Sequence, residues 1–310
     1  MPVIGLELMF VLLWSSGFIG AKYGLPYAGP FTLLLIRYCI VAGLLGAWLC
    51  IHSDFKFVNR AAIARAAIIG VLAHAVWLSA ALGGIALGVS PWIVALITAL
   101  QPMLTSVLSG PILGERISPV QWWGTCIGLV GVVVVVITKL DGAADVSPWG
   151  YVLPFVAAAS MTVSTLYQRH LNGNHAIRLP ILNSLFVQSV TSAIFLCPLA
   201  VMIEGVEVQW TGQFIFALAW LVIMLSIGSY GLMLKLLEHR TAARVASLMY
   251  LTPPTTLILG SLLFGDSITW IDALGLVIAA IGVTLVYQST INLKRRMPRA
   301  DPRRYLSMKP

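Results

Sequence analysis

Few side chains in this sequence could bind a polar ligand or carry a proton, and they stand inside long apolar stretches. His74 and Arg37 are the clearest, because an ionisable group far from water is costly to charge and usually serves a site or a partner. His74 could bind a ligand, carry a proton or hydrogen-bond a neighbouring helix. Arg37 keeps its charge and needs acceptors, which leaves anion recognition and an ion pair with a loop carboxylate equally open.

Glu7 and Lys22 stand near the two ends of the first apolar stretch. Glu7 could carry a proton or remain an interfacial carboxylate, so the residues that could couple ligand binding to an ion are Glu7, His74 and Arg37. Lys22 needs no special role, because a long side chain can extend its ammonium group to the aqueous boundary.

Aromatic rings and hydroxyl groups in the same stretches could surround an organic ligand. Trp14 and Ser15 occupy the middle of the first apolar stretch, and Trp77 follows His74 within one helical turn. The side chains expected to line a cavity are Trp14, Ser15, His74, Trp77, Gln101, Tyr167, Tyr230 and Tyr250. No cluster with metal-ligand spacing accompanies them, so neither a metal nor another cofactor is expected.

Two prolines interrupt apolar stretches of their own. Pro102 and Pro253 lack the N–H that a helix interior needs, and each predicts a helix break. Gln101 and Thr252 directly precede them and could satisfy the freed carbonyl groups or contact a ligand. A break that only shapes helix packing is the other interpretation.

The composition requires a membrane around these groups. Of the 310 residues, 59% are hydrophobic and 10% are charged, whereas a soluble domain carries about 25% charged residues. This composition excludes a soluble enzyme, a disordered chain and a coiled coil. The four cysteines lie within apolar runs without CxxC spacing, which predicts four free thiols.

Ten apolar segments are long enough to cross a bilayer, which takes about 20 residues. Their approximate limits are 4–22, 31–51, 66–86, 90–111, 121–138, 149–168, 180–202, 213–235, 242–263 and 270–288. The weakest boundary is 83–90, where three glycines before Pro91 indicate a turn rather than one overlong helix. The expected fold is therefore an all-α membrane protein with ten transmembrane helices.

The distribution of Lys and Arg predicts the orientation. With the N-terminus in the cytoplasm, 16 of the 19 basic residues fall on the cytoplasmic side, and only Lys22, Arg37 and Lys139 do not. Both termini are then cytoplasmic. The basic tail 292–310 is interpreted as a topology signal that faces anionic lipid, not as a nucleic-acid site.

The second half of the sequence repeats the first. Leu100-Gln101-Pro102 matches Leu251-Thr252-Pro253 at an offset of 151 residues, and Gly114-Glu115 matches Gly265-Asp266 in the same register. The expected units are 1–140 and 141–291, each of five spans. Because five is odd, the second unit enters the membrane inverted, which is typical of secondary transporters.

Three stretches resemble the drug/metabolite transporter superfamily, EamA type. They are Leu13-Trp14-Ser15-Ser16-Gly17-Phe18 with Lys22-Tyr23-Gly24, Leu34-Leu35-Ile36-Arg37-Tyr38, and the duplicated block from Pro102 to Glu115. The resemblance covers nearly the whole chain and implies ten helices in two inverted halves. It also implies movement of small organic metabolites, often amino acids or drugs and frequently outward, and it favours a direct role for His74. Asp266 in place of Glu115 and Gln188 in place of Arg37 depart from a symmetric pattern.

The function expected from these observations is secondary export of small organic metabolites by alternating access around a midplane cavity. A lipid or lipid-precursor flippase of the same fold is the alternative. The sequence lacks HExxH, GxSxG, P-loop and paired intramembrane aspartate motifs, so no enzyme is expected. The expected partners are a small-molecule substrate and the lipid of a bacterial inner membrane, without nucleic acid. The glycine faces of spans five and ten could hold the two halves together or make a homodimer.

Overall fold

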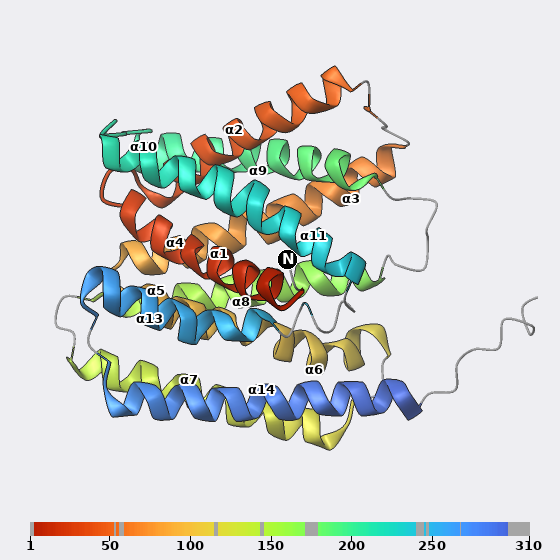
Figure 1. The fold of residues 1–310 in the computed structure, drawn as a ribbon, viewed down its shortest axis with the longest axis vertical. Coiled ribbons are helices and arrows are strands. Elements are labelled where there is room, and N and C mark those ends of the chain that lie inside the picture. The colour runs from red at the N-terminus through yellow and green to blue at the C-terminus, as the bar shows by residue number, and fades with distance from the viewer. Residues whose placement is uncertain are drawn as a thin grey trace, which may run out of the picture.

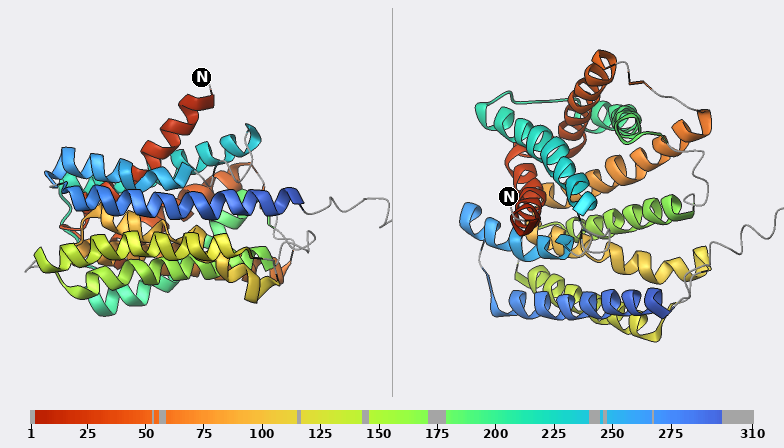
Figure 2. Two further views of the ribbon diagram at one scale, coloured as in Figure 1. Left: turned by 90° about the horizontal axis from the view of Figure 1, so that it is seen from below. Right: turned by 45° about the vertical axis from the view of Figure 1, so that its right-hand side comes forward.

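The structure is a computed structural model that describes residues 3–52, 54–55, 59–114, 117–142, 146–170, 179–239, 245, 248–266 and 268–296. Side chains at 3, 140–142, 230, 234, 237–239 and 290–296 lie outside this description. The described chain is nearly all helical, with one isolated bridge between extended residues Ala28 and Val208. Its long helices lie side by side, as Figures 1 and 2 show.

The first half contains five membrane-length segments, two of which are interrupted. Its elements are α1 Val3–Gly24, α2 Pro30–Ile51, α3 Arg60–Gly70, η1 Val71–Val76, α4 Trp77–Ala86, α5 Pro91–Thr98, α6 Gln101–Leu113 and α7 Pro119–Gly142. The weak boundary at 83–90 is a turn, as expected, with Gly88 at φ +95° before Pro91 starts α5.

The second half follows the same plan. Its elements are α8 Pro148–His170, α9 Ile181–Glu204, α10 Gly212–Ala219, η4 Trp220–Ser229, α11 Tyr230–His239, η5 Met249–Leu251, α13 Thr252–Phe264 and α14 Trp270–Arg296. Over the described residues, nine helical segments are long and apolar enough to cross a membrane, and Met249–Phe264 is a shorter apolar helix. The start predicted for this ninth span, at 242, lies outside the described residues. The prediction of an all-α multi-span fold is confirmed.

One helix begins earlier than predicted. The third span starts at Arg60 and not near residue 66, because Asn59 caps it by accepting from the amides of Ala61 and Ala62 at 2.6 and 3.2 Å. The basic residues Arg60 and Arg65 had indicated a loop. A long basic side chain at a helix end can instead reach the aqueous boundary.

The third span of each half contains a π-helical segment that the sequence analysis did not predict. These segments are η1 and η4. At the repeat offset, His74 in η1 corresponds to Leu225 in η4. A π-helical stretch widens the helix and is frequent at functional sites. The two halves therefore share an interruption at matched positions.

The antiparallel pair α7 and α14 joins the two halves, at the bottom of Figure 1. A Cβ on Gly131 would lie 2.6 Å from the amide nitrogen of Ala279, and one on Gly282 would lie 2.5 Å from the carbonyl oxygen of Gly124. Only glycine permits this backbone contact, which is the close packing expected of small-residue faces. In the structure these faces hold the two halves together.

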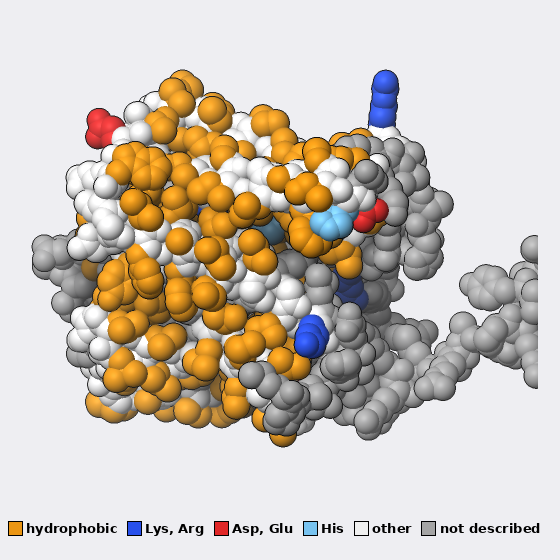
Figure 3. Space-filling view, turned by 45° about the horizontal axis from the view of Figure 1, so that its top comes forward, with side chains coloured by type: hydrophobic (Ala, Val, Ile, Leu, Met, Phe, Trp, Pro, Cys, Tyr) orange, Lys and Arg blue, Asp and Glu red, His pale blue; other side chains and the backbone are white. Residues whose placement is uncertain are grey.

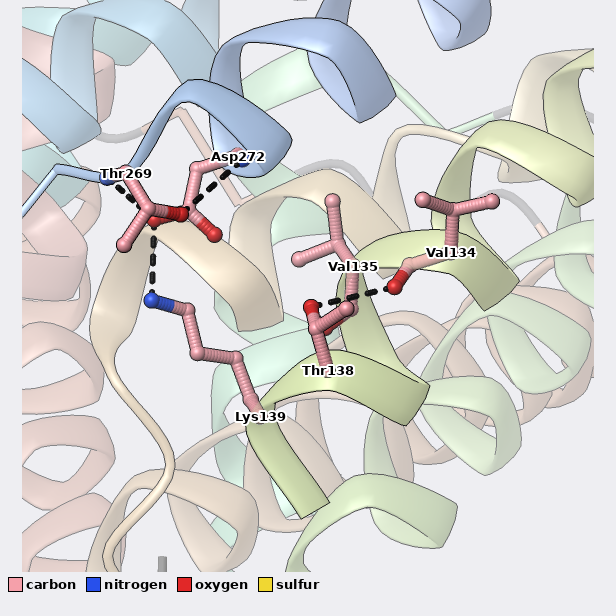
Figure 4. A network of polar contacts seen from close by, with 6 residues as sticks. All are labelled: Val134, Val135, Thr138, Lys139, Thr269 and Asp272. Carbon is pink, nitrogen blue, oxygen red and sulfur yellow. Dashed lines mark hydrogen bonds and ion pairs between the residues drawn. The ribbon is translucent and has the colours of Figure 1, made fainter. Parts of the chain in front are cut away.

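Each helix of this pair starts with a reciprocal side-chain cap. Ser118 and Gln121 exchange hydrogen bonds at the start of α7, and Thr269 and Asp272 do so 151 residues later at the start of α14. Lys139 near the end of α7 donates to Asp272 at 2.8 Å (Figure 4). The caps order the start of each helix, and the ion pair joins the end of α7 to the start of α14.

The core lies around α5, in which every residue from Pro91 to Ile97 is buried. Large apolar side chains also cover the outside of the molecule, and charged side chains appear toward its ends in the view of Figure 3. The four cysteines are free thiols, as the sequence predicted, and all four are exposed. An apolar exterior is the surface that a hydrocarbon environment requires.

Candidate functional site

Five side chains from four elements form a connected group that we call the central polar cluster. Its members are Arg37 and Tyr38 of α2, His74 of η1, Gln188 of α9 and Ser226 of η4. The Nε2 atom of His74 lies 2.9 Å from Oε1 of Gln188. Nε and Nη2 of Arg37 donate to the hydroxyl oxygen of Ser226 at 3.1 and 3.0 Å.

The ring of Tyr38 connects these two hydrogen-bonded pairs. Its centroid lies 5.6 Å from that of the His74 imidazole and 5.6 Å from Cζ of Arg37. Both distances are within the range of ring and cation–π contacts. The two sequence candidates Arg37 and His74 therefore both contact one aromatic ring.

Gln188 connects His74 to Ser184. Its Nε2 donates to the hydroxyl of Ser184 at 2.8 Å, and its Oε1 faces His74. With the amide in this orientation, His74 donates from Nε2, because an amide oxygen only accepts.

The widened turn of η1 is held by hydroxyl groups of neighbouring helices. Ser160 of α8 donates to the carbonyl of Leu72 at 2.8 Å, and Ser192 of α9 donates to that of Gly70 at 3.0 Å. A Cβ on Gly70 would lie 2.7 Å from Cα of Gln188. Glycine at this position lets η1 approach α9 closely enough for His74 to reach Gln188.

The cluster has the symmetry of the repeat. Arg37 and Gln188 occupy matched positions, and Ser226 matches Ala75, the neighbour of His74. The second span of each half therefore reaches the π-helical segment of the opposite half. Two equivalent polar links result, Arg37–Ser226 and Gln188–His74, with different chemistry in each.

Arg37 has no carboxylate partner among the described residues. Arg37 is 6% exposed, and among the described side chains its hydrogen bonds go to Ser226 alone. The loop ion pair considered from the sequence is thus not formed within the described chain. By contrast, Lys22 pairs with Asp266 at 3.3 Å and Lys139 pairs with Asp272.

Gln101 takes part in a different polar contact. Its side-chain amide donates to the hydroxyls of Thr105 and Thr165 at 3.0 and 3.2 Å. Its main-chain carbonyl accepts from the hydroxyls of Thr105 and Thr162. Gln101 therefore connects α6 to α8. Pro102 and Pro253 lie in the first turns of α6 and α13, where a missing N–H costs no hydrogen bond.

Trp14, Ser15 and Trp77 belong to apolar surroundings. Trp14 lies 5.7 Å from Phe10 and packs in a cluster with Leu248 and Leu236, whereas Trp77 packs against the main core. The hydroxyl of Ser15 is fully buried and has no partner among the described side chains.

The remaining candidates belong to elements that contribute nothing to the central polar cluster. Tyr167 is half-buried near the end of α8, Tyr250 is half-buried in η5, and Glu7 is buried in the first turns of α1. The side chain of Tyr230 lies outside the described residues. The cavity lining inferred from these residues stays a prediction.

Sequence reasoning missed three members of the cluster. Gln188 had a signal, since the 151-residue register already paired it with Arg37, and Tyr38 is adjacent to Arg37. Ser226 had none, because a serine within an apolar run resembles any other. Its contact with Arg37 spans 189 residues and depends on the unpredicted π-helical segment η4.

A pocket of about 380 Å³ lies at the end of α1 and the start of α10, lined by Tyr23, Gly212, Gln213 and Phe216. It opens at the helix ends, and none of its lining residues belongs to the central polar cluster. We do not assign the site to it, because its lining offers one amide and no charged group.

Comparison with known proteins gives a consistent result over the whole chain. The EamA-like transporter family matches residues 1–137 and 148–288. An Escherichia coli K12 protein named "Uncharacterized inner membrane transporter YedA" is 23% identical over 288 residues, which are 92% of this chain and 90% of that protein. Proteins of Salmonella typhimurium and Escherichia coli K12, both named "Probable amino-acid metabolite efflux pump", are 24% and 26% identical over 90% of this chain and 92% of their own length.

A solved structure titled "Crystal structure of protein" has the same fold. It superposes with a TM-score of 0.62 at 18% identity and covers 96% of this chain and 99% of its own. At this identity the likeness establishes the fold and nothing further.

Proposed function

We infer the function from two facts together: the chain belongs to the EamA-like transporter family, and its two halves meet in a buried polar cluster. We propose that it is a secondary transporter that exports small organic metabolites across a bacterial inner membrane. Amino acids and their relatives are the first substrates to test, because two relatives carry the name of amino-acid metabolite efflux pumps.

The observation that carries the proposal is the pair of symmetry-related links in the central polar cluster. Arg37 is seven residues from the Pro30 end of α2, and Gln188 is seven residues from the Ile181 end of α9. At 1.5 Å per residue, each lies about 10 Å from its helix end, on opposite sides of the midplane. We propose that each link closes the molecule toward one face.

Alternating access follows from opening one link at a time. In the proposed orientation, Arg37–Ser226 is nearer the outside and His74–Gln188 is nearer the cytoplasm. Parting His74 from Gln188 would admit a substrate from the cytoplasm, and parting Arg37 from Ser226 would release it outside. The two links occupy equivalent places in the two halves, but one contains an arginine and the other a histidine. Each can therefore respond to a different ligand or ion.

The driving force is a gradient, since no nucleotide-binding motif occurs in the sequence. His74 and Glu7 are the titratable side chains proposed for proton coupling. The proposed cytoplasmic position of both termini rests on the distribution of Lys and Arg. A homodimer is likewise a proposal, which rests on the glycine faces of spans five and ten.

Export is tested by measuring the metabolites in the medium of cells that overexpress the protein and of cells that lack its gene. We expect a few small metabolites to accumulate outside the overexpressing cells, and expression of His74→Ala to abolish that increase at equal membrane abundance. An unchanged medium, together with lipid scrambling by the purified protein in vesicles, would contradict export and point to a flippase.

A further inference from the structure

We propose that Arg37 binds the carboxylate of the transported molecule, so that the substrates are carboxylic acids or amino acids and not simple cations. This inference rests on the proposed transport function and adds the substrate class and the residue that selects it. It narrows the substrates expected from the sequence, which included drugs as well as amino acids.

The positive charge of Arg37 is not balanced by a carboxylate among the described residues. The Arg37 guanidinium is buried in α2, and two of its N–H groups converge on one neutral hydroxyl oxygen. Its other donors have no partner among the described residues, and the Tyr38 ring offers only a weak cation–π contact. An always-charged group in such a place needs an anion to be stable.

The rest of the chain makes this deficit specific to Arg37. Lys22 and Lys139, the other basic residues expected away from the cytoplasmic side, each have a carboxylate partner, Asp266 and Asp272. The protein therefore neutralises these two cations internally. Of these three cations, Arg37 alone lacks a counterion among the described residues, and a substrate passes through the central polar cluster in the proposed mechanism.

The geometry of Arg37 suits a carboxylate. A guanidinium presents parallel N–H groups that match the two oxygens of a carboxylate, and such charge-assisted pairs are stronger than bonds to a hydroxyl. A carboxylate would therefore displace Ser226 from Arg37.

Ser226 can be released without being left unpaired. Its hydroxyl donates to the carbonyl of Leu221 at 3.1 Å, within η4 itself. Displacement therefore costs the Arg37–Ser226 link and nothing else at this serine. Because that link joins α2 to η4, carboxylate binding would loosen the closure on the outer side, which couples recognition of the substrate to its release.

The test uses the full-length protein and compares an amino acid with the analogue in which an uncharged carboxamide replaces the carboxylate. Purified protein in phosphatidylcholine vesicles is given phenylalanine or phenylalaninamide, which differ in the carboxylate and share the ring and the amine. We expect wild-type protein to move phenylalanine at least about 10-fold faster than the amide, the factor that a charge-assisted hydrogen bond supplies. Arg37→Met should remove this preference.

Two variants separate binding from structure. Ser226→Ala removes the acceptor of Arg37 and should keep the preference for phenylalanine, whereas a purely structural Arg37 would lose function equally in Ser226→Ala and Arg37→Met. Lys139→Met removes a membrane cation that has a carboxylate partner and should leave the preference unchanged. Protection of each protein from thermal unfolding by phenylalanine gives a readout that does not depend on transport.

The outcomes are distinguishable. If wild-type protein moves the amide as fast as phenylalanine, or if Arg37→Met keeps both the preference and the thermal protection, Arg37 is not the carboxylate site and transport still stands. If wild-type protein moves neither compound nor any other amino acid or drug of a panel, the proposed function fails and this inference fails with it. If thermal protection through Arg37 requires phosphatidylglycerol instead of phenylalanine, the anion is a lipid headgroup and the inference is wrong.

Discussion

At the scale of single residues, the hydrogen bond between His74 and Gln188 affects stability because both of its partners lie in an apolar site. His74 lies in a widened helical turn, and Gln188 approaches it because Gly70 leaves room for the α9 backbone. Removing one partner leaves the other polar and unpaired in an apolar site, which costs more than removing both.

This asymmetry predicts the behaviour of three variants. Gln188→Leu should lower the free energy of unfolding by about 1–3 kcal/mol, since His74 loses its acceptor. His74→Phe should be similar, and the double variant should be more stable than the sum of the two losses predicts. Chemical denaturation of the four proteins in detergent measures the coupling energy, and strict additivity would show that the two side chains do not interact.

The residues of the site were predictable in part. Arg37 and His74 stood out because their charge or polarity conflicts with an apolar stretch. Ser226 did not, because its role depends on a partner 189 residues away. Composition identifies which group needs a partner, whereas only the packing of α2 against η4 identifies the partner.

At the scale of elements, the joint between α7 and α14 depends on glycine. Gly131→Ala should destabilise the protein by about 1–3 kcal/mol, because the added methyl group would overlap the α14 backbone at Ala279. Gly43→Ala in α2 is the matched control, since nothing lies within 4 Å of its added Cβ. Thermal unfolding followed by tryptophan fluorescence compares the two. An equal shift in both would refute the close packing.

The ion pair at one end of this joint gives a second prediction. Asp272→Asn keeps an oxygen to accept from the Thr269 amide and removes the charge that faces Lys139 (Figure 4). We expect a loss of about 2 kcal/mol in the free energy of unfolding. Lys139→Met added to Asp272→Asn should recover part of it, and no recovery would mean that the cap at Asp272 matters more than the pair.

The elements were predictable to different degrees. Apolar length and turn residues predicted the nine membrane-length helices and the shorter apolar helix Met249–Phe264 of the described residues, because a bilayer imposes both apolar length and turns between spans. The early start of α3 was missed, since Asn59 outweighs the two basic residues that follow it. The π-helical segments η1 and η4 were missed because no residue type signals them. Hydroxyls of helices distant in sequence donate to the carbonyls of Leu72 in η1 and of Gly70 directly before it.

At the scale of the whole molecule, the repeat and the basic residues predict the topology together. Reporter fusions after residues 55, 115, 175, 240 and 295 should read cytoplasmic, and fusions after 28, 143, 207 and 266 should read external. The fusion after 266 is decisive for the inversion, because its repeat mate at 115 should read the opposite. Equal readings at 115 and 266 would overturn the inverted repeat.

The central claim is that the protein carries organic metabolites by alternating access through the central polar cluster. Counterflow in proteoliposomes tests it most directly: vesicles are loaded with an unlabelled amino acid at high concentration and diluted into a trace of the labelled compound, and uptake of label is followed without an imposed ion gradient. The account predicts transient accumulation of label with wild-type protein and its loss with His74→Ala. Equilibration without accumulation, or the same accumulation in His74→Ala, would contradict it.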